Sequence, residues 1–185
     1  MTRARITEKF AALKKENRAG LVIYLMGGDP DAETSLSLLK ALPKAGADFI
    51  ELGFPFSDPT ADGPTIQAAG KRALEQRITL KKILKIVRQF REMDTDTPII
   101  LMGYYNPVLA YGEERFCIDA QDAGVDGLLI VDLPLEEDES LHKECKTHHL
   151  SLIKLAAPTT SPARAKQIVK HAGGFLYYVS IAGIT

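Results

Sequence analysis

Apolar residues gather in six short runs along the chain, and the segments between the runs have helical spacing. The runs lie at 21–25, 49–52, 98–102, 127–131, 150–155 and 175–179. Between the second and third runs, for example, Ile83, Val87 and Phe90 recur at intervals of three and four residues, which places them on one face of a helix. The pattern therefore predicts a repeated strand–helix unit and an α/β fold.

The predicted strands are almost continuously hydrophobic, as in the run Gly-Leu-Leu-Ile-Val at 127–131. Such runs are typical of parallel strands that are buried on both faces. Turn and polar residues follow the strands at 27–30, 103–107, 132–134 and 157–160, so we expect function at the carboxyl ends of the sheet. A doubly wound sheet and a (β/α)8 barrel both agree with this pattern.

The segment before the first strand places Ile6, Phe10 and Leu13 at helical spacing, and such a helix would close the bottom of a barrel. A complete barrel takes about 250 residues, whereas the chain has 185 residues and six predicted strands. We therefore expect a single domain over 1–185. If it is a barrel, it comprises an N-terminal helix and strands one to six, cut short before strands seven and eight.

Composition excludes several classes of protein. The 23 basic and 24 acidic residues leave a net charge of -1, so nucleic acid is not an expected partner. Lysines interrupt the N-terminal segment, and no apolar stretch reaches membrane length, so we expect a cytoplasmic protein. Cys117 and Cys145 fall in amphipathic segments and are expected to be buried thiols. The four His residues lack metal-ligand spacing, so no metal is expected, and His148 and His149 are expected only to cap a helix.

Glu51 is the first candidate for chemistry. Side chains alternate between the faces of a strand, so Glu51 shares a face with Phe49 and Gly53, while Ile50 and Leu52 point the other way. If that face is the interior of a barrel, burial disfavours the carboxylate and raises its pKa toward neutrality. The sequence thus permits a general acid/base at this position.

The motifs of the chain resemble, in order and along its whole length, those of the tryptophan synthase alpha subunit family. They are LMGGDP at 25–30, ELGFPFSDPTADGPTIQ at 51–67, MGYYNP at 102–107, DLP at 132–134, APTT at 157–160 and YYVSIAGIT at 177–185. The resemblance implies a (β/α)8 TIM barrel of the ribulose-phosphate-binding type. It also implies the retro-aldol cleavage of indole-3-glycerol phosphate to indole and glyceraldehyde 3-phosphate in L-tryptophan biosynthesis.

The resemblance implies roles for residues that match the family motifs. Glu51 and Asp62 resemble the catalytic pair. The implied substrate-binding positions are Tyr24, Ala61, Met102, Tyr104, Leu129, Tyr177 and Thr185, and the implied subunit-interface positions are Pro55, Asp58, Asn106, Pro107, Asp132 and Pro134. Each of these is also explained by core packing or by turn chemistry. The implied partner is a beta subunit in an α2β2 complex, which carries pyridoxal phosphate, and no cofactor is implied for this subunit.

The chain departs from the family pattern at three places. Lys154 stands in the fifth strand where an uncharged residue is more common. We expect its stem to point outward between helices with the ammonium group in water, or to contact solvent at an incomplete sheet edge; a Schiff-base lysine is the alternative. Val131 replaces a common proline. The glycine-rich phosphate loops would lie beyond Thr185, so a fragment of weak or absent activity, a non-catalytic activator of the beta subunit and a related phosphate-substrate barrel enzyme remain as alternatives.

Overall fold

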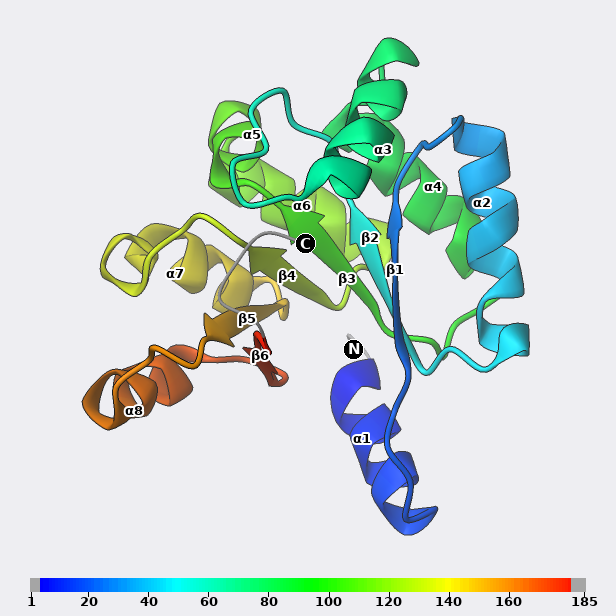
Figure 1. The fold of residues 1–185 in the computed structure, drawn as a ribbon. Helices are drawn as coiled ribbons and strands as arrows, with labels where there is room; N and C mark the ends of the chain where they lie inside the picture. Colours follow the sequence, from blue (N-terminus) through cyan, green and yellow to red (C-terminus); the bar gives the residue numbers. More distant parts are fainter. Residues whose placement is uncertain (1–3, 181–185) are drawn as a thin grey trace.

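The computed structural model describes residues 4–180 and contains a curved sheet of six strands with helices around it (Figure 1). The strands are β1 (Val22–Met26), β2 (Phe49–Gly53), β3 (Ile99–Gly103), β4 (Gly127–Ile130), β5 (Ser151–Ala156) and β6 (Leu176–Tyr178). The helices are α1 (Arg5–Lys15), α2 (Ala32–Ala41), α3 (Pro64–Glu75), α4 (Leu80–Arg91), α5 (Tyr105–Tyr111), α6 (Glu113–Ala123), α7 (Glu139–Thr147) and α8 (Pro162–His171). Two short 3-10 turns, η1 (Pro43–Ala45) and η2 (Leu135–Glu137), complete the set. All six predicted strands are confirmed within one or two residues at their ends.

The strand order decides between the two α/β architectures that the sequence left open. All neighbours are parallel and follow chain order from β1 to β6, with register pairs such as Tyr24 with Glu51 and Glu51 with Ile100. A doubly wound sheet reverses its strand order at a switch point, whereas a (β/α)8 barrel adds each strand beside the last. The described strands therefore form the barrel arrangement, with α2, α4, α6, α7 and α8 along the outside of the curve (Figure 1).

Two apolar cores lie on opposite faces of the sheet. Ile50, Leu52 and Leu101 face outward and pack with the helices in the larger core. Phe49, Ile100, Leu129 and Ile153 face inward and form the smaller core together with Ile6 and Leu13 of α1. The alternation of side chains along each strand produces this division, and it places the face of Phe49 inside the barrel.

Helix α1 closes the N-terminal end of the strands, as predicted. Its buried residues Ile6 and Leu13 contact the inner core, and the Phe10 ring lies 4.7 Å from the Phe49 ring, measured between centroids. Figure 1 shows the helix below the starting ends of the strands. The opposite, carboxyl-terminal end of the sheet is thereby left for the loops that follow the strands.

A buried ion network fastens this closed end. Asp126 precedes β4 and is almost fully buried. Its two oxygens accept from Arg5 at 2.8 Å and Arg91 at 2.7 Å, and it also accepts from the backbone N–H of Ile99 at 2.8 Å. Because one carboxylate joins α1, α4 and the starts of β3 and β4, it holds α1 against the sheet.

Residues with a known preference for helix ends cap several of the helices. Thr79 accepts a hydrogen bond from the backbone N–H of Lys82 at the start of α4, and Ser161 caps α8 in the same way. Gly124 ends α6 in the left-handed region, with φ of 89°. Helix α8 ends at His171, and its C-cap is Ala172 rather than a glycine. Over residues 4–180, no helix combines the length and the apolar character that crossing a bilayer requires.

Candidate active site

Glu51 lies in the middle of β2 and points into the barrel. Its side chain shares the inner face with Phe49, and the residue is only 4% exposed. The carboxylate oxygen Oε1 is buried and has no hydrogen-bond partner among the residues described. The prediction that this acid is shielded from water is therefore confirmed.

The chemical consequence of this burial is a shifted pKa. Desolvation by burial raises the pKa of Glu51 from 4.5 to about 7. Among the described residues, burial accounts for that shift, because Glu51 shares the inner face with the apolar core of Phe49, Ile100 and Leu129. A carboxyl group with a pKa near neutrality can both give and take a proton at physiological pH.

Asp62 reaches the same end of the barrel from the loop between β2 and α3. Burial raises its pKa, while a hydrogen-bonding interaction with the Tyr104 hydroxyl lowers it in opposition. The Tyr104 oxygen also accepts from the backbone N–H of Ala61 at 2.9 Å, and Gln67 donates to the Asp62 carbonyl at 2.8 Å. The loop is thus fastened on both sides of the carboxylate.

The Tyr24 phenol interacts electrostatically with both acids. Burial raises the pKa of its phenol first, and the charges of Asp62 and then Glu51 raise it further. Tyr177 on β6 behaves similarly, because burial and then the charge of Glu51 raise its pKa. Both acids therefore act electrostatically on one phenol, and Glu51 acts on a second phenol as well.

A small apolar pocket lies beside Asp62 at the carboxyl ends of β1 and β3. Four predicted site residues line it: Asp62, Tyr24, Met102 and Tyr104. Met26, Phe54, Gly103 and Val131 complete the lining and were not predicted as site residues. Phe54 stood inside the motif at 51–67, and an aromatic residue directly after a strand was the available signal for it.

Two glycines leave room for the aromatic rings of Tyr24 and Phe54. A Cβ added at Gly53 would lie 2.3 Å from the Tyr24 hydroxyl oxygen, and one added at Gly103 would lie 2.4 Å from the Phe54 ring. Real Cβ atoms do not approach other heavy atoms so closely, and interiors do not absorb such overlap without strain. The glycines at the ends of β2 and β3 are therefore required by the shape of the site.

The remaining predicted substrate positions differ in their surroundings. Leu129 is fully buried in the inner core, opposite Met102 in the register of β3 and β4. Tyr177 is half-buried on the inner face, and Ala61 is exposed at the mouth of the loop. Thr185 lies outside the described residues.

The predicted interface residues follow the carboxyl ends of β2, β3 and β4. Pro55, Asp58, Asp132 and Pro134 lie in loops, whereas Asn106 and Pro107 were expected in a loop and instead lie in the first turn of α5, because the helix begins only two residues after β3. Asp58, Asn106, Asp132 and Pro134 are exposed, Pro107 is half-buried, and Pro55 is buried. Asp132 accepts from the backbone N–H of Tyr105 at 2.8 Å, so it also stabilises the start of α5. These loops form one rim around the site.

Lys154 points outward from β5, as expected for a stem, but it does not reach water. It is buried and forms an ion pair with the buried Asp138, which precedes α7. The expected solvent contact is wrong, because Asp138, at the start of the helix that precedes β5, pairs with the ammonium group inside the protein. The outward direction also separates Lys154 from the inner face that carries Glu51.

The cysteines and the His pair lie as predicted. Cys117 and Cys145 are free and buried between α6 and α7. His148 is the C-cap of α7, and His149 follows with φ of 57°.

Comparison with known proteins adds independent evidence. A family model described as "Tryptophan synthase alpha chain" matches residues 10–185. The tryptophan synthase alpha chain of Caulobacter vibrioides (strain NA1000 / CB15N) is 60% identical over 185 residues, which is all of this chain and 67% of that protein.

Solved structures agree with these sequence matches. The tryptophan synthase subunit alpha of Legionella pneumophila str. Paris superimposes with a TM-score of 0.93 at 48% identity, over 95% of this chain and 67% of that one. A chain of the tryptophan synthase a2b2 complex of Pyrococcus furiosus gives a TM-score of 0.83 at 42% identity, over 88% of this chain and 68% of that one. The chain spans about two thirds of the length of the relatives that it matches.

Proposed function

The chain belongs to the tryptophan synthase alpha chain family, and on that basis we propose that it cleaves indole-3-glycerol phosphate to indole and glyceraldehyde 3-phosphate. The observation that carries the proposal is the position of Glu51, a lone acid inside the barrel with a pKa of about 7. The reaction is a retro-aldol cleavage, in which one carbon–carbon bond breaks and no electrons are gained or lost overall.

Glu51 is the proposed acid and base of the reaction. In its protonated form it gives a proton to C3 of the indole ring. It then takes the proton of the hydroxyl on the adjacent side-chain carbon. The new C=O bond of glyceraldehyde 3-phosphate forms as the bond to C3 breaks, and its electron pair returns to the indole ring. A single acid with a pKa near neutrality serves both transfers, because it is neither fully protonated nor fully ionised at physiological pH.

Asp62 is the proposed electrostatic partner. Protonation of C3 leaves positive charge on the ring nitrogen, and a carboxylate near that N–H stabilises the charge as it develops. The partial burial of Asp62 strengthens the interaction, since it reduces screening by water. The hydrogen bonds that Tyr104 and Gln67 make to this loop keep the carboxylate in place.

The remaining site residues are proposed to hold the indole ring. Tyr24, Met102 and Tyr104 line the pocket beside Asp62 with flat or polarisable surface, which suits a planar aromatic ligand. Ala61, Leu129, Tyr177 and Thr185 are assigned to the same binding site from their positions in the family motifs. The mechanism uses only side-chain proton transfer and electrostatics, so we assign no cofactor to this subunit.

The proposed partner is a tryptophan synthase beta subunit, which would carry pyridoxal phosphate and receive the indole. One solved relative is a chain of the tryptophan synthase a2b2 complex of Pyrococcus furiosus, a complex that shows mutual activation. Asp58, Asn106, Asp132, Pro107 and Pro134 are accessible on the rim around the site, and we assign this rim and Pro55 beneath it to the subunit contact. A cytoplasmic location is proposed, as for other enzymes that make small metabolites.

An indole-release assay tests the proposal, with indole-3-glycerol phosphate as substrate and with the beta subunit absent or present. The chain contains no Trp, so indole fluorescence excited beyond the Tyr absorption band reports ligand binding to this chain without a Trp background. We expect Glu51→Gln to lower the rate by about 10²–10⁴-fold, the usual contribution of a general acid/base. Ring binding and association with the beta subunit should be unchanged.

Glu75→Gln serves as the matched control, since Glu75 is exposed on α3 away from the pocket. It should retain the full rate. If Glu51→Gln releases indole as fast as the parent chain, the assignment of the acid/base is wrong. If Glu51→Gln loses indole release and beta-subunit association together, its role is structural.

A further inference from the structure

A second group of chemically active side chains lies on the outside of the barrel, away from the inner face that carries Glu51. Asp138 precedes α7, His142 follows one helical turn later, and His171 is the last residue of α8. One ligand atom from each of the three residues lies within 4.8 Å of the others. We propose that these three side chains form a binding site for a divalent transition-metal ion such as Zn²⁺.

The ligand set matches the chemistry of such ions. Zn²⁺ and Co²⁺ bind imidazole nitrogen and carboxylate oxygen, and two His with one carboxylate leave a fourth position for water. Bonds of about 2.0–2.2 Å in a tetrahedral site place neighbouring ligand atoms roughly 3.3 Å apart. In the structure, Asp138 Oδ1 lies 3.9 Å from His171 Nδ1, which is too long for a direct hydrogen bond. This pair would need to close by about 0.6 Å to share a tetrahedral ion, and none of the three ligand atoms lies more than 4.8 Å from another.

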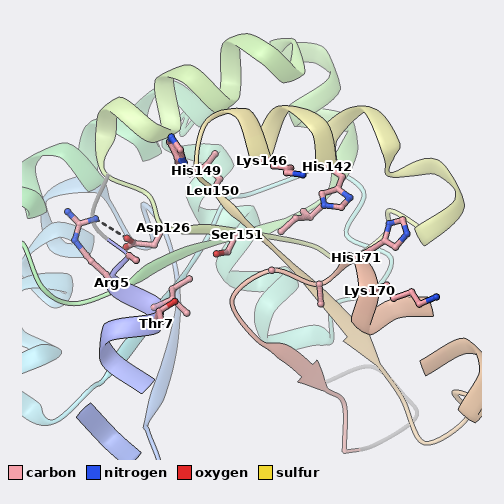
Figure 2. A pocket seen from close by; sticks show the side chains of 15 residues that line it. Arg5, Thr7, Asp126, His142, Lys146, His149, Leu150, Ser151, Lys170 and His171 are labelled. Carbon is pink, nitrogen blue, oxygen red and sulfur yellow. Dashed lines mark hydrogen bonds and ion pairs between the residues drawn. The ribbon is translucent and has the colours of Figure 1, made fainter. Parts of the chain in front are cut away.

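The two imidazole rings are already arranged side by side. Their centroids are 5.4 Å apart, with a 49° angle between the ring planes. Figure 2 shows His142 on α7 and His171 at the end of α8 pointing toward one another across the rim of a pocket of about 410 Å³. The His171 side chain is 45% exposed, so an ion can enter and the ring can turn to meet it.

Asp138 is the anchor of the cluster. Its side chain is 1% exposed, and its Oδ2 faces the Lys154 ammonium group but receives no well-formed hydrogen bond within residues 4–180. A buried carboxylate that ligates a metal is usually held by an outer partner in this way. Lys154 would keep the Asp138 side chain oriented, with Oδ1 on the side of His171.

Lys154 also limits the strength of the site. It places one positive charge beside the position of the ion, so the cluster contributes no net negative charge when both His are neutral. We therefore expect moderate binding of Zn²⁺ or Co²⁺, and none of Mg²⁺ or Ca²⁺, which need sites rich in oxygen ligands. This proposal does not depend on the lyase activity.

Titration of the metal-free chain with Co²⁺ tests the site, because Co²⁺ bound by imidazole and carboxylate gives visible absorption bands. We expect the bands to saturate at one ion per chain and to be displaced by Zn²⁺. His142→Asn and His171→Asn should each weaken binding by at least the roughly tenfold that even an outer-sphere partner contributes. His149→Asn is the matched control: His149 lines the same pocket outside the cluster, and Asn tolerates its positive φ.

A second measurement needs no variant. Diethyl pyrocarbonate modifies accessible His side chains, and mass spectrometry locates the modified residues. Zn²⁺ should protect His142 and His171 and leave His149 reactive. The proposal is overturned if Co²⁺ gives no bands, if the bands survive both cluster variants, or if Zn²⁺ protects His149 equally.

Discussion

Burial of Glu51 predicts that the proposed catalytic acid destabilises the folded protein at neutral and alkaline pH. Its pKa is about 7 in the folded state, against an ordinary value of 4.5. Between these two values the folded chain binds a proton that the unfolded chain has lost, so the free energy of unfolding falls as pH rises. Below about pH 4.5 the group is neutral in both states and there is no effect.

The size of the effect follows from the shift. One pKa unit corresponds to about 1.4 kcal/mol, so the full destabilisation above pH 7 is about 3 kcal/mol. Glutamine at position 51 has nearly the same shape and no charge. Relative to the parent chain, Glu51→Gln should therefore gain about 2–3 kcal/mol in the free energy of unfolding between about pH 5 and about pH 8.

Urea unfolding of both chains at the two pH values measures this change. The comparison cancels the titration of every other group, because those groups are present in both chains. Glu75→Gln, an exposed substitution on α3, is the control, and its difference from the parent should be nearly independent of pH. The reasoning is refuted if the stability gain of Glu51→Gln is the same at both pH values.

Two further substitutions test the packing of the site and of the closed end. Gly53→Ala would bring a Cβ within 2.3 Å of the Tyr24 hydroxyl oxygen. We expect the free energy of unfolding, measured in urea, to fall by about 1–3 kcal/mol, and fluorescence to show weaker indole binding. Unchanged values would show that Tyr24 moves freely. Asp126→Asn removes the charge that pairs with the buried Arg91 and with Arg5. We expect the free energy of unfolding, measured by chemical denaturation, to fall by about 3–5 kcal/mol. A decrease below about 1 kcal/mol would contradict the role of Asp126 in holding α1 to the sheet.

The sequence alone determined the elements and the direction of Glu51, because both are local properties. Strands and helices were recognisable from periods of two and of three to four residues. The inward direction of Glu51 followed from its position two residues after Phe49, because successive side chains in a strand alternate between faces. Burial of that face then sufficed to predict the direction of the pKa shift.

Phe54 shows where local patterns became insufficient. Its ring lines the pocket because Gly103, on the next strand, leaves room for it. The two residues are far apart in the sequence, and neither has a pattern that points to the other. The sequence predicted the acids of the site but not the complete wall around them.

Only the tertiary structure decided how the sheet curves and which distant side chains meet. The hydrophobic pattern was equally compatible with a doubly wound sheet, and the sequential order of β1 to β6 excluded it. Asp138, Lys154 and His171 come together from separate elements, so their spacing along the chain carried no sign of a cluster. Packing of α7 and α8 against β5 produces that contact, and long-range packing of this kind depends on the whole fold.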